Sequence, residues 1–233
     1  MELALYIGAY TVYMLSRGLV FPGEQIALSH ADWVIAVEQA LGFFWEPGWQ
    51  AWTVANAPGL VVVLNWIYIL TYWPIILGLA IVLYLIRRRT YGYYRNVMVV
   101  HLLLALLVFT LFPLAPPYMV SAYFIDTIQT FGPTFYGGTG MAPYYNNLAA
   151  MPSLHFSWSV IFGVLFFRNF KGWFKISGVL YPVLTFFAIT ITGNHYILDA
   201  LVGGALAGIA FAVLDLVIKP RLWLRWRKQA TTQ

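Results

Sequence analysis

Two histidines and one aspartate in this sequence have the residue types and spacing needed for acid–base or nucleophilic chemistry. His155 lies in the stretch MPSLHFSW, where a proline and a serine interrupt the apolar text as a new hydrophobic run begins. His195 and Asp199 stand four residues apart, which places both on one helical face if that turn is helical. A carboxylate beside an imidazole holds the ring in one tautomer, so the opposite nitrogen becomes a better base or nucleophile.

These three side chains predict a nucleophile, an orienting carboxylate and a general acid. In this interpretation His195 attacks, Asp199 orients its ring, and His155 donates a proton to a leaving group. Each residue also has a structural alternative. A histidine at a helix end is often only interfacial, as we expect for His30 and His101, and an aspartate in a first helical turn complements the helix dipole. The joint pattern favours chemistry, because ionisable residues within a membrane are costly without a function.

The composition indicates that membrane helices position these residues. The chain has 233 residues, of which 61% are hydrophobic and 9% charged, whereas about a quarter of the residues in a soluble domain are charged. Apolar runs of roughly 20 residues can cross the hydrocarbon core as helices. We therefore predict an all-α integral membrane protein, a six-helix bundle forming a single domain over residues 1–233. The spans are expected at about 3–21, 57–86, 96–115, 151–168, 174–193 and 197–218.

An interfacial amphipathic helical segment is expected between spans one and two. The residues from Ser29 to Asp32 have the form of a capping box, which would open the first helix of this segment. Its apolar side would carry Val34, Val37, Leu41 and Phe44. Pro47 is expected to start a second short helix.

The distribution of charge predicts the orientation in the membrane. Twelve of the thirteen lysines and arginines lie in three alternate connections, at 87–95, 168–175 and 219–228. By the positive-inside rule these connections and both termini are expected to be cytoplasmic. The histidines and Asp199 then lie at the outer face of the membrane, which we expect to be the plasma membrane. The opposite connections carry acids, namely Glu24, Asp32, Glu38, Glu46 and Asp126. The basic clusters thus predict contact with membrane lipids and not with nucleic acid.

Two short motifs carry a resemblance to a known family. PSLH at Pro152–His155 and GNHYILD at Gly193–Asp199 resemble the paired signatures of the type 2 phosphatidic acid phosphatase superfamily, usually PSGH and SR-x5-H-x3-D. Three further stretches resemble the branch that includes inositol phosphorylceramide synthases and bacterial membrane lipid phosphatases: FPLAPPY at 112–118, YMLSRGL at 13–19 and the dipeptide NW at 65–66.

The resemblance implies a six-helix membrane fold and a two-step phosphoryl transfer that uses neither a metal nor another cofactor. It assigns His195 as the nucleophile that becomes a phosphohistidine and Asp199 as the group that orients it. His155 then protonates the departing oxygen and later activates the acceptor. These roles agree with those that the residues and the predicted topology indicate.

The sequence departs from the family pattern at its arginines. The position six residues before the nucleophilic histidine is Ile189, and the arginine of the APPR ending is replaced by Tyr118. Arg88 and Arg95 echo the K-x6-RP signature but fall on the predicted cytoplasmic side. Arg17, near the outer end of span one, is therefore the expected cation for the phosphoryl oxygens. Further donors are expected from Ser153, Asn194, Tyr118 and Tyr144.

The leading hypothesis is a lipid phosphate phosphatase acting on a phospholipid or an isoprenoid phosphate. The first alternative is a phosphotransferase that moves a phospho-headgroup such as inositol phosphate to a lipid or polyol alcohol. The second is a non-catalytic lipid-binding or transport protein. A metal hydrolase could use His155, His195 and Asp199 as ligands. An intramembrane serine protease is disfavoured, because Ser153 stands two positions from His155 without a glycine elbow.

Overall fold

The described part of the protein is helical throughout. The computed structural model describes residues 23–70, 72–120, 122–133 and 148–218, together with Gly8 and Thr11. Within these residues the only strand-like pairing is an isolated bridge between Leu114 and Ala149. The all-α prediction is therefore confirmed for these residues, and most of the first predicted span, about 3–21, lies outside them.

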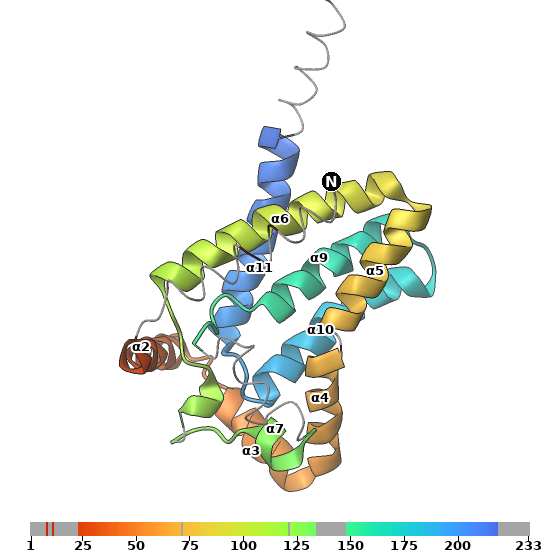
Figure 1. Cartoon of the computed structure of the whole chain (residues 1–233). Coiled ribbons are helices and arrows are strands. Elements are labelled where there is room, and N and C mark those ends of the chain that lie inside the picture. The colour runs from red at the N-terminus through yellow and green to blue at the C-terminus, as the bar shows by residue number, and fades with distance from the viewer. Residues whose placement is uncertain are drawn as a thin grey trace, which may run out of the picture.

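Figure 1 shows how the helices are arranged. In chain order they are α2 (Glu24–Leu41), α3 (Glu46–Asn56), α4 (Pro58–Leu70), α5 (Trp73–Ile86), α6 (Arg88–Leu111), η1 (Pro117–Met119), α7 (Thr127–Phe131), α9 (Leu154–Asn169), α10 (Trp173–Ile191), α11 (Ile197–Ala212) and the π-helical turn η3 (Val213–Ile218).

The described residues contain three to four candidate membrane spans. α6, α10, and α11 continued into η3 are long and apolar enough to cross a bilayer, and α4 with α5 would form a fourth span bent by 43°. Pro74 in the first turn of α5 cannot donate a hydrogen bond to the carbonyl of Leu70, which explains why α4 ends there. α9, predicted as the span 151–168, has 16 residues, fewer than the roughly 20 that a span needs. The count of six spans stays a prediction.

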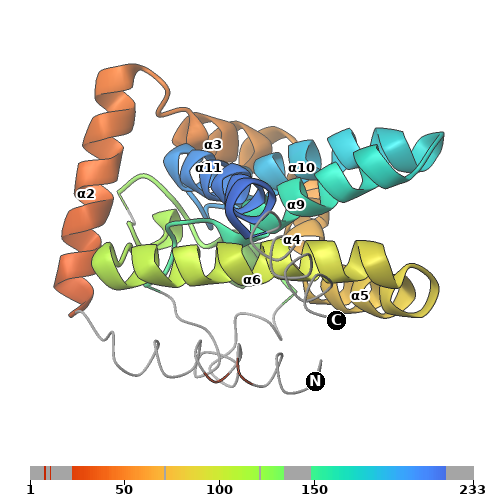
Figure 2. The same cartoon turned by 90° about the horizontal axis from the view of Figure 1, so that it is seen from above.

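The closest helix pair brings the start of α9 and the end of α10 to the same end of the bundle. The two helices lie side by side and antiparallel in both views (Figures 1 and 2). A Cβ atom on Gly163 would lie 2.5 Å from the carbonyl oxygen of Gly178, so the backbones approach too closely for any side chain. α6 and α11 complete the core against α9, through side chains such as Val97, Ile161 and Ala207.

α2 lies crosswise at one end of this bundle (Figures 1 and 2). The predicted capping box is wrong: α2 begins at Glu24, and Ser29 lies inside it with its hydroxyl donating to the carbonyl of Ile26. The predicted apolar side is also only partly correct, because Val34 is buried but Leu41 is 67% exposed. The face that packs on the bundle carries small residues and, at its end, a carboxylate; its buried members are Ala27, Ala31, Val34, Ile35 and Glu38.

α3 follows the sequence prediction more closely. It begins at Glu46, and Pro47 occupies its first turn, as expected. Three tryptophans on α2 and before or within α3 are more than half exposed: Trp33, Trp45 and Trp52. Exposed tryptophans are typical of residues at the membrane–water interface, which supports the predicted interfacial position of this segment.

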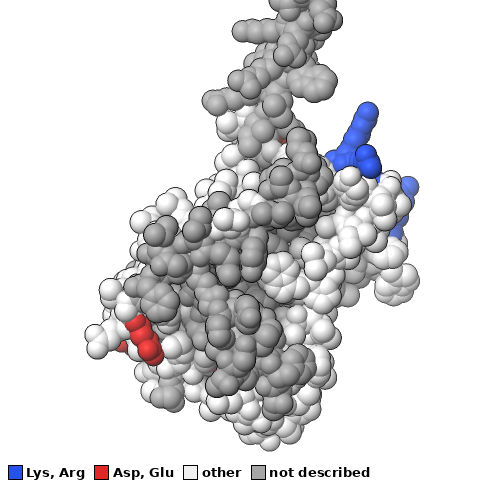
Figure 3. Space-filling view, in the orientation of Figure 1, with Lys and Arg blue, Asp and Glu red and all other residues white. Residues whose placement is uncertain are grey.

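The basic residues of the described chain gather at the end where α5 meets α6 and α9 meets α10 (Figure 3). The guanidinium of Arg87 donates to the carbonyl of Asn169 at 3.0 Å and lies 5.0 Å over the ring of Phe170. The α5–α6 and α9–α10 connections therefore contact each other, and the charge distribution predicts both on the same side of the membrane. Their cytoplasmic location stays a prediction.

Neither of the histidines that we expected at the interface is simply solvent-facing. His101 is fully buried within α6, and its Nδ1 accepts a hydrogen bond from the indole of Trp158 at 3.1 Å, so an interfacial position is wrong. His30 is half-buried, stacks on Phe112 and has its Nδ1 2.7 Å from the carbonyl oxygen of Pro113. Both rings hold helices in place.

Candidate active site

The structure brings His155, His195 and Asp199 together. The helix ends that carry them, namely the starts of α9 and α11 and the end of α10, lie opposite the α5–α6 and α9–α10 connections (Figure 1). The ring centroids of the two histidines are 6.0 Å apart, and their planes are tilted by 53°. His195 Nδ1 lies 3.3 Å from Asp199 Oδ2. The pair forms although His195 precedes the helix, because α11 begins at Ile197 and Asp199 reaches back from its first turn.

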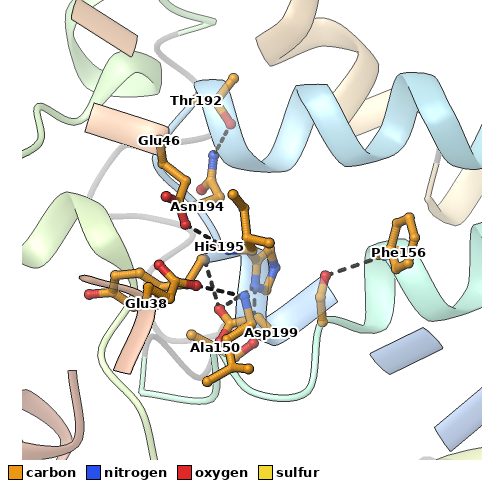
Figure 4. A network of polar contacts seen from close by, with 12 residues as sticks. Glu38, Glu46, Ala150, Phe156, Thr192, Asn194, His195 and Asp199 are labelled. Atoms are coloured by element: carbon orange, nitrogen blue, oxygen red, sulfur yellow. Dashed lines mark hydrogen bonds and ion pairs between the residues drawn. The ribbon is translucent and has the colours of Figure 1, made fainter. Parts of the chain in front are cut away.

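The contacts of His195 determine which of its nitrogens carries the proton. Nδ1 lies 2.9 Å from the carbonyl oxygen of Ala150 and 3.3 Å from the carboxylate of Asp199 (Figure 4). Both groups are hydrogen-bond acceptors, so Nδ1 must donate. In the neutral ring the lone pair is then on Nε2, which is the nitrogen available for attack.

The end of α10 explains why His195 stands where it does. Gly193 has φ of 73°, a left-handed conformation that favours glycine. Its N–H donates to Thr190, and the N–H of Asn194 donates to Ile189, the two hydrogen bonds of a Schellman motif that closes a helix. The N–H of His195 also donates to the carbonyl of Ile189, at 3.0 Å. The nucleophile candidate therefore follows a fixed helix end.

His155 lies in different surroundings, between two tyrosine rings. The ring centroids of Tyr68 and Tyr72 are each 4.2 Å from that of His155, with interplanar angles of 23° and 30°. Two nearly parallel rings at this distance cannot share one face of an imidazole, so they cover opposite faces. Nε2 of His155 is buried and has no hydrogen-bond partner within the described ranges.

A match to a family model identifies the chain at the level of a superfamily. The model described as the PAP2 superfamily matches residues 32–213, which include both histidines and Asp199. The chain belongs to the PAP2 superfamily. No curated protein and no solved structure matches it. Because PAP2 members are phosphatases or phosphotransferases, the protein is a membrane enzyme of the phosphoric ester hydrolase type in general, and the branch stays a prediction.

The serine of the first PAP2 motif has a structural contact. Ser153 is the N-cap of α9, and its Oγ accepts a hydrogen bond from the N–H of Phe156 at 3.3 Å. Its own N–H donates to the carbonyl of Asp199, so the start of α9 is tied directly to the first turn of α11. The helix begins at Leu154, and Pro152 therefore precedes the cap and lies outside the helix, although the predicted span began at about residue 151. A buried, capping serine is also a poor candidate for a protease nucleophile.

Two other predicted substrate-binding residues lie around the Gly193 turn. Asn194 is buried, and its amide donates to Thr192 Oγ1 at 2.7 Å. Tyr118 in η1 is half-buried, and its N–H donates to the carbonyl of Gly193. Burial, with a smaller effect from the charge of Asp126, raises the pKa of Tyr118 to about 12, so its hydroxyl keeps its proton at neutral pH.

The missing PAP2 arginines are not replaced within the described ranges. Ile189 is fully buried, so that position belongs to the core. Arg88 lies over Tyr84 and Arg95 over Tyr91, at the far end of the bundle, which agrees with their rejection as phosphate ligands. Arg17 and Tyr144 lie outside the described residues.

The geometry does not favour a metal site built from the two histidines and Asp199. Nδ1 of His195 already donates to Ala150 and Asp199, and Oδ2 of Asp199 also accepts from the N–H of Tyr196. No group of three His, Cys, Asp or Glu side chains in the described part of the chain has an arrangement suited to a metal ion.

Sequence analysis missed two glutamates that reach the site from far along the chain. Glu38 and Glu46 were counted only among the acids of the outer connections, but both are fully buried. Oε1 of Glu38 accepts from the N–H of Leu198 and Oε1 of Glu46 from that of Ile197, each at 2.7 Å (Figure 4). The available signal was the helical spacing of Ala27, Ala31, Val34 and Glu38, which follow one another at intervals of four, three and four residues.

Polar side chains also lock the loops around the site. Asn65, part of the NW dipeptide, donates to the carbonyls of Thr127 and Gly132 and accepts from the Thr127 hydroxyl. Gln50 donates to the carbonyls of Ile125 and Ile191. These contacts explain Asn65 as a buried structural residue that fastens α7 to α4.

Proposed function

We propose that the protein is a membrane-embedded lipid phosphate phosphatase that acts through a phosphohistidine intermediate. The observation that supports this most directly is the fixed tautomer of His195, whose Nδ1 donates to two acceptors and whose Nε2 is left as the nucleophile. The PAP2 match adds the reaction class.

In the first step Nε2 of His195 attacks phosphorus and the bond from phosphorus to the lipid oxygen breaks. The lipid alkoxide takes a proton from His155 and leaves as an alcohol. In the second step His155 takes a proton from water, the resulting hydroxide attacks the phosphohistidine, and inorganic phosphate leaves while His195 is regenerated. Asp199 stabilises the positive charge that forms on the His195 ring.

The phosphoryl oxygens need donors that stabilise their charge. We assign this role to Arg17, with further hydrogen bonds from Tyr118, Asn194, Ser153 and Tyr144. Tyr118 is half-buried, and its backbone N–H donates to the carbonyl of Gly193, which supports its part in this assignment.

The substrate is a phospholipid or an isoprenoid phosphate bound from the outer leaflet of the plasma membrane. Two observations support this proposal. The candidate site and the arginine-rich connections occupy opposite ends of the described bundle, and the exposed tryptophans of α2 and α3 lie beside the site end. A lipid headgroup at the membrane interface would then lie at the same depth in the membrane as the two histidines.

The test uses purified protein in detergent micelles containing dioctanoyl phosphatidic acid. We expect release of inorganic phosphate, insensitivity to chelators and a trapped phosphoryl group on His195 after rapid acid-free quenching of labelled substrate. H195A should give neither product, whereas H30Q, which alters a histidine outside the site, should give both. Activity that falls with chelator and returns with added metal would overturn the mechanism.

A phosphotransferase is the second candidate, and the surroundings of His155 favour it. The tyrosine rings on both faces of the imidazole form an apolar wall, which suits an alcohol acceptor as well as water. Adding diacylglycerol, ceramide or inositol to the same assay distinguishes the two reactions. Phosphate release that no alcohol diverts into a new phosphomonoester supports the phosphatase. If substrate stays intact under all conditions, a lipid-binding or transport function takes its place.

A further inference from the structure

Three buried carboxylates surround the first turn of α11. Oδ2 of Asp199 accepts from the N–H of Tyr196 at 3.0 Å, and the next two amides along the chain donate to Glu46 and Glu38 at 2.7 Å each. All three acids are fully buried. Three consecutive amides, at 196, 197 and 198, are thus each held by a different carboxylate.

Glu38 and Glu46 replace a local helix cap. Tyr196 occupies the N-cap position of α11, where serine, threonine, aspartate or asparagine would normally supply the oxygen, and its side chain makes no capping hydrogen bond. The oxygens come instead from α2 and α3, 160 and 151 residues earlier in the chain. Figure 4 shows both glutamates directed at the backbone that follows His195.

Glu38 and Glu46 are too deeply buried for both carboxyls to be ionised. Oε2 of each has no hydrogen-bond partner in the described chain if both carboxyls are charged. The other titratable groups that surround them are Asp199, His195 and Tyr196, and of these Asp199 adds negative charge, whereas burial raises the pKa of Tyr196 and keeps it neutral. Burial, then a hydrogen bond to Glu46, raises the pKa of Glu38 to about 9, so Glu38 donates this proton to Glu46 at neutral pH.

We propose that Glu38 and Glu46, joined by one shared proton, are positioning residues for the nucleophile. They fix the turn that carries His195 and Asp199 against the interfacial helices α2 and α3. This inference rests on the proposed function, because it assigns the pair to the reaction of His195. The geometry gives the reason: Asp199 Oδ2 contacts both His195 and the N–H of Tyr196, so a shift at the start of α11 moves the orienting carboxylate away from the imidazole.

Glutamine substitutions separate the hydrogen bonds from the proton. In E38Q the side-chain oxygen can still accept from Leu198, and the new amide can donate to Glu46 without any titration. In the double variant E38Q/E46Q both oxygens are used by backbone amides, so two NH₂ groups face each other with no acceptor. E24Q is the matched control, because Glu24 lies on the same helix and is exposed.

Infrared spectroscopy of the purified full chain tests the shared proton without any substrate. We expect an absorption band from a buried protonated carboxyl at neutral pH, which decreases as the pH rises through about 9. E38Q should lack that component and E24Q should keep it. An unchanged band in E38Q and in E46Q would overturn the shared proton.

Turnover of dioctanoyl phosphatidic acid tests the positioning role. E38Q should stay within about twofold of wild type at neutral pH and should lose the decline at high pH that wild type shows. The double variant should fall about tenfold or more in kcat with a smaller change in KM, since the nucleophile and not the substrate contact is displaced. A double variant with wild-type kcat, or an E38Q as impaired as the double variant, would contradict the inference.

Hydrogen exchange separates failure of this inference from failure of the proposed function. If wild type releases no phosphate, the proposed function fails, and the exchange of the amides at 196–198 still tests the pair. E38Q should protect these amides as wild type does, and the double variant should lose the protection. Equal protection in all variants would mean that the pair does not hold the turn.

Discussion

His195 is held by hydrogen bonds, whereas His155, on the other side of the same site, is held by two tyrosine rings. Nδ1 of His195 donates to Ala150 and Asp199, and three buried acids lie behind it. His155 stacks at 4.2 Å between Tyr68 and Tyr72, and its Nε2 has no partner in the described ranges.

This difference assigns different tasks to two residues of one type. Acceptors at one nitrogen fix the tautomer, which is what a nucleophile with a lone pair on the other nitrogen requires. Stacking fixes the plane of a ring but leaves its nitrogens free to gain and lose a proton. A proton donor that must become a base in the next step needs that freedom.

The largest expected effect comes from removing each histidine in turn. H195A should abolish turnover of any phosphate ester, because no nucleophile remains. H155A should lower turnover of phosphatidic acid by about 10²–10⁴-fold, but should retain much more activity on p-nitrophenyl phosphate, whose leaving group needs no proton. Equal loss on both substrates in H155A would remove the distinction between the two histidines.

D199N should have the next largest effect. An asparagine amide can donate to Nδ1 of His195, which would move the ring proton to Nε2 and remove the nucleophile. We expect turnover to fall by about 10²-fold or more, with KM nearly unchanged. The carbonyl of Ala150 still favours the original tautomer, so D199N should keep more activity than H195A.

Substitutions at Tyr72 test the other half of the comparison. Y72L removes one face of the aromatic pair and should lower kcat by about three- to tenfold. Y72F keeps the ring and should stay within about twofold of wild type. If the two variants are equally impaired, the tyrosine hydroxyl and not its stacking on His155 carries the effect.

The sequence predicted the residues of the site better than it predicted what holds them. His155, His195 and Asp199 stand at ends of hydrophobic runs, and the ends of runs are readable from composition. The contact of the Ala150 carbonyl with His195 cannot be predicted from the sequence, because every residue has a backbone carbonyl. Tyr72 reaches His155 only because α4 and α5 bend at their junction, within a run that looked like one span.

The acidic pair was missed for a different physical reason. The buried face of α2 is made partly of alanines, which carry a weak hydrophobic signal, so the helix start and its inward face were both misassigned. Glu38 was counted only among the acids of the outer connections, and its partner amide, that of Leu198, lies 160 residues further along the chain. A contact between residues this far apart in the sequence cannot be predicted from the local spacing of residues.

The smallest expected effect concerns stability, and it is confined to the His195 side. Burial raises the pKa of Glu38 from an ordinary value of 4.5 to about 9, so between these pH values the folded protein keeps a proton that the unfolded chain releases. The stabilisation from this proton is complete below pH 4.5 and is lost as the pH rises to about 9. The thermal midpoint of wild type should therefore fall between pH 5 and pH 9, whereas that of E38Q should fall less. E24Q should follow wild type, and Y72F should too, because neither substitution removes the proton of Glu38. A wild-type midpoint that rises over this range would show that Glu38 is ionised in the folded protein, and the polar half of the site would then need another source of charge balance.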